Sequence, residues 1–273
     1  MTQMRNTRAP DVAGGAVLRP FTARSVLASA LLGADPPDLP VAHLVHLAGL
    51  FGINANRARV ALSRMCASGE ATAVGAGRYR LAGHLEDRRA RQEASRAGRT
   101  RPWNGDWRVV VVTTSGTEAG PRARRRRALQ FSRLAELREG VWARPDNIDS
   151  QLPASLEGDV VVMTARLDHG LEVAARLWTL PAWSEWATGL LRRLEELPPT
   201  GPDDLAPGFA LSAAVLRHLQ SDPLLPAELL PLGWPGDELR STYDGWDRRY
   251  REVLGEWARS DPRDGVGPVA RGR

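Results

Sequence analysis

The sequence contains no lysine and only one cysteine, and it has no long apolar run. All 37 basic residues are arginine, which we interpret as a compositional bias. The single cysteine, Cys66, cannot form an internal disulfide, which indicates a reducing compartment. No segment approaches the roughly 20 apolar residues of a membrane-spanning helix, and residues 1–20 lack the apolar core of a signal peptide. We therefore expect a cytoplasmic protein with no membrane partner.

The chain is long and its charge is unevenly distributed. With 273 residues, of which 42% are hydrophobic, it can build more than one core. Residues 1–145 contain 24 arginines and 11 acidic residues, a net charge of +13. Residues 146–273 contain 13 arginines and 21 acidic residues, a net charge of −8. A basic front half joined to an acidic back half is typical of a protein with one nucleic-acid-binding face.

The region from residue 21 to residue 82 has the pattern of a winged helix-turn-helix domain. Apolar residues recur there at helical spacing in three segments, and Thr22, Pro40 and Asn54 suit the starts of these helices. Two short alternating runs joined by Gly-Ala-Gly predict a hairpin. In such a domain the third helix enters the DNA major groove and the hairpin contacts the backbone. The predicted elements are helices over residues 22–32, 40–50 and 55–68, and strands over 71–74 and 78–81.

The third predicted helix carries its arginines outside the apolar stripe. Ala58, Ala61, Leu62 and Met65 recur at spacings of three or four and predict the buried side. Arginine can form two hydrogen bonds with guanine, asparagine can do so with adenine, and serine can contact bases or phosphates. The alternative for this helix, and equally for the hairpin arginines, is an ordinary solvated surface. The predicted DNA-binding residues are Asn54, Asn56, Arg57, Arg59, Ser63, Arg64, Arg78 and Arg80.

The sequence predicts further domains after this region. Residues 83–102 read as a charged connecting helix and linker. Residues 103–168 contain two continuous apolar runs typical of buried strands, and a strand–helix–strand–helix–strand order that fits a small ferredoxin-like domain. Residues 169–258 are predicted to be helical, and the tails, 1–20 and 259–273, to be disordered. The fold class is therefore α+β and mostly helical. Within the middle domain, the expected elements are strands over 109–113, 140–145 and 159–165, and a helix over 121–137.

Several short strings resemble the phenylacetic acid degradation repressor (PaaX-like) family of bacterial transcription regulators. Together they span about residues 20 to 257, and their order and spacing match the family. The resemblance implies an N-terminal winged helix, a central domain similar to the CRISPR-associated Cas2 fold and a helical C-terminal domain. It also implies a homodimeric repressor that an aryl-CoA thioester such as phenylacetyl-CoA releases from DNA. The strings are RARVALSR (57–64), WNGDW (103–107), GVW (140–142), LW (177–178), DPLLP (222–226) and WP (234–235).

An effector and a dimer are expected from these features. CoA carries several negative charges and an apolar acyl end, so its site needs arginines beside an aromatic or leucine-lined pocket. We predict such a cleft between the middle and C-terminal domains. The acidic, leucine- and tryptophan-rich residues 170–257 predict the homodimer interface, and a dimer would bind an inverted repeat in double-stranded DNA. The predicted effector-binding residues are Arg124, Arg125, Arg126, Arg127 and Trp178.

We predict no catalytic residues, no metal site and no cofactor. His43 and His46 lie three apart on a predicted helix, but no third ligand is evident, and no glycine-rich phosphate loop is present. The alternative function is a DNA-processing enzyme or nuclease that uses the Cas2-like middle domain. Nucleases of that type hold a divalent metal with an aspartate at the end of the first strand. Here that strand ends in VTTS (112–115), without a carboxylate.

Overall fold

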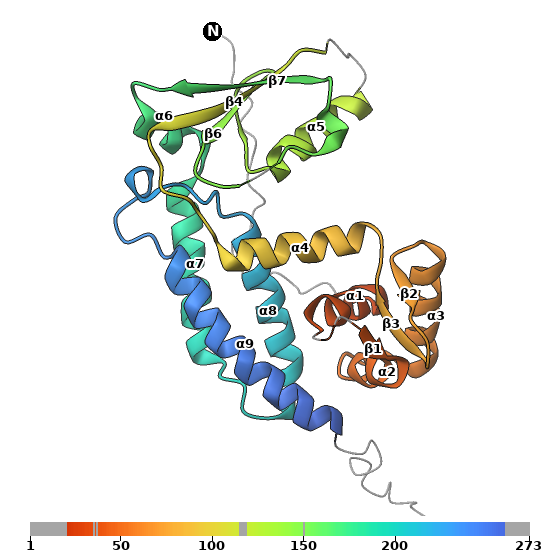
Figure 1. The fold of residues 1–273 in the computed structure, drawn as a ribbon. Helices are drawn as coiled ribbons and strands as arrows, with labels where there is room; N and C mark the ends of the chain where they lie inside the picture. The colour runs from red at the N-terminus through yellow and green to blue at the C-terminus, as the bar shows by residue number, and fades with distance from the viewer. Residues whose placement is uncertain (1–20, 35, 37, 115–118, 150, 260–273) are drawn as a thin grey trace, which may run out of the picture. The chain divides into compact units, whose positions relative to one another are not determined.

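The computed structural model describes residues 21–34, 36, 38–114, 119–149 and 151–259 of the chain. The predicted tails, 1–20 and 259–273, therefore lie outside the described residues, apart from Arg259. The chain divides into two compact units, which meet in sequence between Glu86 and Asp87. The described residues are mostly helical, and each unit contains one small antiparallel sheet (Figure 1).

Unit 1 contains three helices and a three-stranded sheet, and local capping fixes where two of the helices begin. The hydroxyl of Thr22 accepts a hydrogen bond from the Ser25 N–H at 3.1 Å, and the side-chain oxygen of Asn54 accepts one from the Arg57 N–H at 2.9 Å. Such caps satisfy N–H groups that a helix leaves free at its first turn. The elements are α1 (Ala23–Gly33), β1 (Asp38–Pro40), α2 (Val41–Gly49), α3 (Ala55–Ala67), β2 (Ala71–Ala73) and β3 (Arg78–Leu81).

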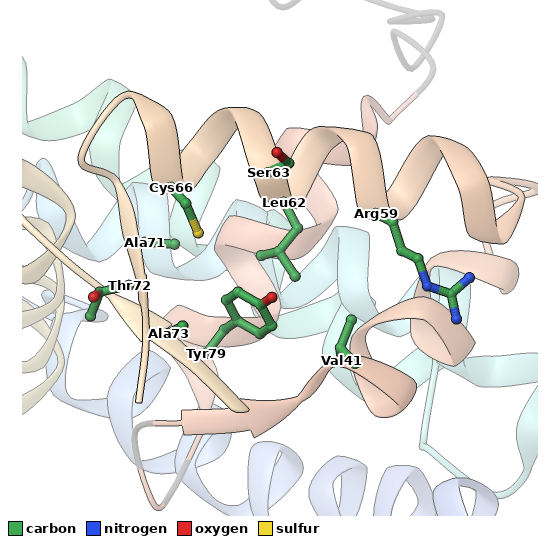
Figure 2. Close-up of a pocket in the computed structure, with 9 residues that line it drawn as sticks. All are labelled: Val41, Arg59, Leu62, Ser63, Cys66, Ala71, Thr72, Ala73 and Tyr79. Atoms are coloured by element: carbon green, nitrogen blue, oxygen red, sulfur yellow. The ribbon is translucent and has the colours of Figure 1, made fainter. Parts of the chain in front are cut away.

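The strand order of this sheet is β1-β3-β2, so the predicted hairpin forms its centre and one edge. Strand β1 was not predicted, because three residues that include a proline carry no readable alternation. Tyr79 on β3 and Leu62 on α3 lie toward one another (Figure 2). The hairpin is thereby held against α3, and the turn between its strands has positive φ angles at Gly75, Ala76 and Gly77.

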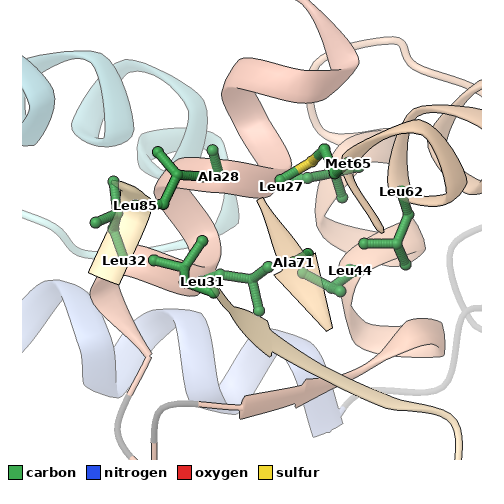
Figure 3. Packing of buried hydrophobic residues seen from close by; sticks show 10 residues of the cluster. Leu27, Ala28, Leu31, Leu32, Leu44, Leu62, Met65, Ala71 and Leu85 are labelled. Carbon is green, nitrogen blue, oxygen red and sulfur yellow. The ribbon is translucent and has the colours of Figure 1, made fainter. Parts of the chain in front are cut away.

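The core of unit 1 is formed by the inward faces of its helices and the hairpin (Figure 3). Three members of the predicted stripe on α3, Ala58, Leu62 and Met65, are 1–3% exposed, and the fourth, Ala61, is partly buried against the same core. The remaining buried members come from α1, α2, the hairpin and the first turn of α4. They are Leu27, Ala28, Leu31, Leu32, Leu44, Ala71, Leu81 and Leu85.

Unit 2 is built around a four-stranded antiparallel sheet of order β5-β6-β4-β7. On one face, Val110 and Trp142 pack beneath Leu129 of α5. On the other face, Trp107 and Ala143 belong to a cluster with residues of α6 and α7. The elements are α4 (His84–Ala97), β4 (Asp106–Val112), α5 (Ala119–Phe131), β5 (Ala135–Arg138), β6 (Val141–Pro145), the 3-10 turn η1 (Ala154–Leu156), β7 (Val160–Arg166) and α6 (Gly170–Leu177).

Three expectations for this domain are wrong. The helix predicted over 121–137 ends at Phe131, and the chain then turns through Arg133, which has a φ of 58°. Residues beyond the turn form β5, because pairing with β6 outweighs their helical spacing. Phe131, the last residue of the helix, is 48% exposed. The order also differs, since two strands follow α5 directly and only η1 precedes β7.

The third wrong expectation concerns β7, which was predicted to be a buried strand. Strand β7 lies at the end of the sheet order, and it pairs only with β4 among the described strands. Val161, Val162 and Met163 are 45–49% exposed. A continuous apolar run is typical of a strand covered on both faces, but periodicity alone does not show which strand of a sheet is at its edge.

The C-terminal part of unit 2 is helical, as predicted. Helices α7 (Leu180–Glu196), α8 (Leu205–Gln220) and α9 (Gly236–Arg259) pack pairwise against one another (Figure 1). Two further 3-10 turns, η2 (Pro202–Asp204) and η3 (Ala227–Leu229), lie in the connections. Residues 222–226, in the connection between α8 and η3, are all buried. None of the helices in the described part of the chain has both the length and the apolarity needed to span a membrane.

Candidate nucleic-acid interface

Helix α3 presents one polar face that is opposite its buried stripe. Successive residues are rotated by about 100° around a helix axis, so Asn56, Val60 and Ser63 point most directly away from the core. Arg57 and Arg64 lie on one flank of that face, and Arg59 lies on the other. All of the predicted α3 residues are exposed: Asn54, Asn56, Arg57, Arg59, Ser63 and Arg64.

Among the residues that the structure describes, the arginines of α3 have no acidic partners. No ion pair joins Arg57, Arg59 or Arg64 to a carboxylate within the described residues, and the helix itself contains no acidic residue. Other arginines of unit 1 are paired. The Arg24 Nε donates to a Glu70 carboxylate oxygen at 2.7 Å, and Arg78 binds Asp38. The N–H donors of the α3 guanidinium groups are therefore available to an external anion.

Asn54 acts locally as the N-cap of α3, with its side-chain oxygen directed at the backbone. Its amide group remains able to donate. Val60, which sequence reasoning did not select, stands at the centre of the outward face and is 42% exposed. An exposed apolar side chain between polar ones suits contact with a thymine methyl group. Its position on the helix, opposite the buried stripe, could have predicted that Val60 faces outward, whereas its residue type could not.

The two hairpin arginines are in different environments. The guanidinium of Arg78 donates to both carboxylate oxygens of Asp38, at 2.9 and 3.1 Å, and to the Asp38 carbonyl at 3.0 Å. This bidentate pair lowers the pKa of the Asp38 carboxyl below its usual value. Arg80 is exposed, and no ion pair is recorded for it in the described structure. Arg78 therefore ties β3 to β1, whereas Arg80 is available to a phosphate.

A hollow lined by residues of both α3 and the hairpin lies between these elements, as Figure 2 shows. Residues 71–73 of β2, an Ala-Thr-Ala run, line it, and their small side chains leave this space open. Cys66 also lines it, and burial raises the pKa of its thiol, so it stays protonated at neutral pH. The other lining residues are Val41, Arg59, Leu62, Ser63 and Tyr79.

The predicted effector residues are not brought together. Helix α5, which carries Arg124 to Arg127, packs on the sheet face of Val110 and Trp142. Trp178 packs on the opposite face, where its ring is stacked 6.4 Å from that of Trp107. Alternate residues of a strand point to opposite faces, and β4 places Trp107 and Val110 on different sides. One ligand cannot use both predicted groups without crossing the sheet.

Most of the α5 arginines are already engaged. Arg122 binds Glu139 at 2.8 Å, Arg125 binds Thr114 at 2.8 Å and lies 3.4 Å from an Asp159 carboxylate oxygen, and Arg126 pairs with Glu136. Arg126 also stands over the Trp142 ring, 5.5 Å from its centroid. Arg124 and Arg127 are exposed, and no carboxylate partner is recorded for either in the described residues.

Arg127 lines a hollow between α4 and α5 within unit 2. The exposed ring of Phe131 lies beside it, and the guanidinium carbon of Arg91 stands 3.9 Å above the centroid of that ring. A predicted effector arginine and an aromatic ring therefore line the same hollow here. The remaining lining residues are Asp87, Ala90, Ala128 and Pro153.

Comparison with known proteins agrees with this architecture. The family model described as PaaX-like protein matches residues 22–85, and the model described as PaaX protein central Cas2-like domain matches residues 100–168. A solved structure, described as uncharacterized protein Rv0674 from Mycobacterium tuberculosis, is 40% identical, and the alignment covers 86% of this chain and 98% of that chain with a TM-score of 0.69. No match was found among curated proteins.

The two model matches follow one another along the chain as an N-terminal region and a central Cas2-like domain. The chain belongs to the PaaX-like family, as the resemblance in its sequence indicated. This family consists generally of transcriptional regulators of phenylacetate catabolism, which accords with the prediction that the protein is not an enzyme. Among the residues that the structure describes, no group of three or more His, Cys, Asp or Glu side chains could hold a metal ion.

Proposed function

We propose that unit 1 is a winged-helix domain that binds double-stranded DNA, and that the chain is a cytoplasmic, sequence-specific repressor. In this arrangement α3 lies in the major groove and the β2–β3 hairpin rests on the backbone. The observation that carries the proposal is the outward face of α3. It combines three arginines without acidic partners with an asparagine, a serine and an exposed valine, which together can read base edges and methyl groups.

The proposal is tested by selecting binding sites from a pool of random DNA duplexes with the full-length protein. We expect enrichment of one sequence, with an inverted repeat if the protein binds as a homodimer. The triple variant Arg57→Gln, Arg59→Gln, Arg64→Gln should lose this enrichment. The control Arg122→Gln, Arg124→Gln, Arg127→Gln removes the same charge from exposed positions on α5 and should retain it. If both variants lost the enrichment equally, the general attraction between arginines and DNA would explain binding, and the assignment of α3 as the DNA-reading helix would be rejected.

The same selection separates a regulator from a nuclease. Adding magnesium or manganese to the bound DNA should leave it intact, because β4 ends at Val112 and the residues that follow it, Thr113 and Thr114, carry no carboxylate. Metal-dependent cleavage of the selected duplex would support the DNA-processing alternative.

We further propose that an aryl-CoA thioester relieves repression. The hollow beside Arg127 supports this, since Arg91 and Arg127 can meet negative charge there while Phe131 offers an aromatic surface. A ligand can shift the protein away from its DNA-binding state only by its difference in affinity for the two states. Relief is therefore expected to be partial if that difference is small.

The effector is tested by titrating phenylacetyl-CoA into the complex with the selected duplex. Free CoA and phenylacetate serve as controls for the two halves of the molecule. We expect the thioester to weaken the complex and the controls to act weakly. Arg127→Gln should reduce the response, whereas Arg124→Gln, which removes an exposed α5 arginine outside the hollow, should preserve it. Complete insensitivity to acyl-CoA would reject the effector and leave DNA binding unaffected.

A further inference from the structure

Strand β7 presents an open edge to the surroundings of unit 2. It is the last strand in the order β5-β6-β4-β7, and it runs seven residues from Val160 to Arg166. Its whole length pairs with β4, so its other edge is the outer boundary of the sheet in the described structure. An unprotected edge strand is a template for pairing with another strand.

The hydrogen-bond pattern shows which residues point outward. The Thr113 N–H donates to the Asp159 carbonyl at 3.0 Å, which is a hydrogen-bonded pair in the register of β4 and β7. Such pairs alternate along an antiparallel ladder. The backbone groups of Val161 and Met163 therefore face β4, whereas those of Val162 and Thr164 face away from it. The outer edge offers alternating donors and acceptors to a further strand.

The side chains on this edge are apolar and uncharged. Val161 is 49% exposed, Val162 is 48% exposed and Met163 is 45% exposed, so neither α5 nor α6 covers the strand fully. Residues 160–165 contain no ionisable side chain. Natural edge strands usually carry a charge, a proline or a bulge that prevents pairing, and β7 has none of these between its ends. Isolated exposed residues such as Leu171 and Trp186 are common on protein surfaces, but three in succession on a bare edge are not.

We propose that β7 pairs antiparallel with β7 of a second copy of this chain and joins the two four-stranded sheets into one. Complete overlap of the two seven-residue strands places Met163 on the two-fold axis. Val162 then faces Thr164 of the partner copy, and both have outward backbone groups, as an antiparallel pair requires. The symmetry is isologous, so a single surface supplies both halves of the interface.

The charges at the ends of β7 select the second copy and the antiparallel direction. Asp159 directly precedes the strand and Arg166 ends it. Asp159 forms an ion pair with Arg125 of α5. Arg166 forms an ion pair with Asp106. Because side chains alternate between the two faces along β4, Asp106 points to the same face as Val110, which α5 covers. Antiparallel pairing brings the acidic end of each strand beside the basic end of the other on this face. Parallel pairing would place like charges together.

This inference does not rest on DNA binding, because assembly is measured without DNA. It places the interface in the Cas2-like domain instead of residues 170–257, where the sequence predicted it. Sedimentation equilibrium of the full-length protein at micromolar concentration should give a species of twice the 29.8 kDa chain mass. A monomer under these conditions would overturn the proposal.

Substitutions at outward positions test the edge itself. Val162→Pro removes an outward N–H and spares the ladder to β4, and Thr164→Lys adds the charge that edge strands normally carry. Each should weaken dimerisation at least tenfold while the far-UV circular dichroism spectrum stays unchanged. Leu171→Lys, at an exposed apolar site on α6, is the matched control and should leave dimerisation unchanged. A dimer that persists in both β7 variants, or that Leu171→Lys dissociates, would overturn the proposal.

A disulfide tests the register. Cys66→Ala removes the only native thiol, and Met163→Cys then places one cysteine on the axis in each copy. Opposed residues in a non-hydrogen-bonded antiparallel pair have Cα atoms about 4.5 Å apart, which lies in the range that a disulfide spans. Mild oxidation should yield a covalent dimer. Val161→Cys in the same background faces Ala165 of the copy and should not crosslink. Failure of Met163→Cys to crosslink, or equal crosslinking by both, would reject this register.

Discussion

Helices α3 and α5 are both short and rich in arginine, but their arginines have different surroundings. Those of α3 stand on an exposed face without acidic neighbours, whereas three of those on α5 pair with carboxylates. The carboxylates come from β5, from the turn after it and from the residue before β7. The availability of an arginine for DNA thus depends on which strands the fold places beside its helix, and local arginine density is a poor guide.

The difference has an energetic basis. An arginine that already binds a carboxylate must give up that contact before it binds a phosphate, so its net contribution to DNA affinity is small. An unpaired arginine releases only water and counterions. The following predictions test whether this difference in pairing, and not the number of arginines, decides which helix binds DNA.

The largest effect is expected when α3 is given an acidic partner of the kind that α5 has. Val60→Glu places a carboxylate in the middle of the outward face and four residues before Arg64, an order that favours a helical ion pair. The new charge repels phosphates and occupies Arg64, so the loss of affinity for the selected duplex should exceed that of a single arginine deletion. Fluorescence anisotropy measures the affinity. Val60→Gln is the uncharged control, and equal losses in both variants would show that charge pairing is not the cause.

Removing single arginines should produce the next largest effect. Arg57→Ala and Arg59→Ala should each cost about 1–3 kcal/mol of binding free energy and relax specificity at one base pair. Arg126→Ala on α5 should change affinity little, since that side chain pairs with Glu136. Titration of each variant against single-base variants of the duplex checks both statements. Unchanged affinity in Arg57→Ala and in Arg59→Ala would refute the major-groove assignment.

Sequence patterns predicted the framework of the interface better than its electrostatics. The helices of unit 1 and both hairpin strands lie within a residue or two of their predicted bounds, because apolar spacing and capping residues are local signals. The pairing of Arg78 with Asp38 could not be predicted, because β1 has no readable pattern. In unit 2 the end of α5 and the exposure of β7 were missed, since both depend on strand order, which is a property of the whole sheet.

The hairpin also contains one arginine that is paired with a carboxylate, Arg78, and one that is not, Arg80, so it allows the same comparison between single residues. Arg80→Ala should lower the slope of the logarithm of the binding constant against the logarithm of salt concentration by about one, as expected for one lost phosphate contact. Arg78→Ala should change that slope less, because its guanidinium binds Asp38. Binding is measured at several salt concentrations for both variants. A larger slope change for Arg78→Ala than for Arg80→Ala would reverse the assignment.

The smallest expected effect concerns the stability of unit 1 and its dependence on pH. The Arg24 guanidinium, which hydrogen-bonds to Glu70, holds the pKa of that carboxyl below its usual value of 4.5. A lowered pKa in the folded state stabilises the protein above the unfolded pKa, and this contribution is lost as the pH falls through the folded pKa. Because Arg24 is 60% exposed, the pair should contribute only about 0.2–1 kcal/mol.

Glu70→Gln isolates this contribution, since glutamine keeps the shape of the side chain and removes its charge. Hydrogen exchange, followed by mass spectrometry in peptides of α1 and the hairpin, should show faster opening in the variant than in the wild type above about pH 5. The difference should begin to shrink near pH 4.5, the usual value of the carboxyl, and should vanish as the pH falls through the lower pKa of Glu70 in the folded protein. Peptides from α5 provide the internal control and should not respond to the substitution. A difference between the two proteins that stays constant from neutral to acidic pH would mean that the Arg24–Glu70 pair does not stabilise unit 1 through its charge.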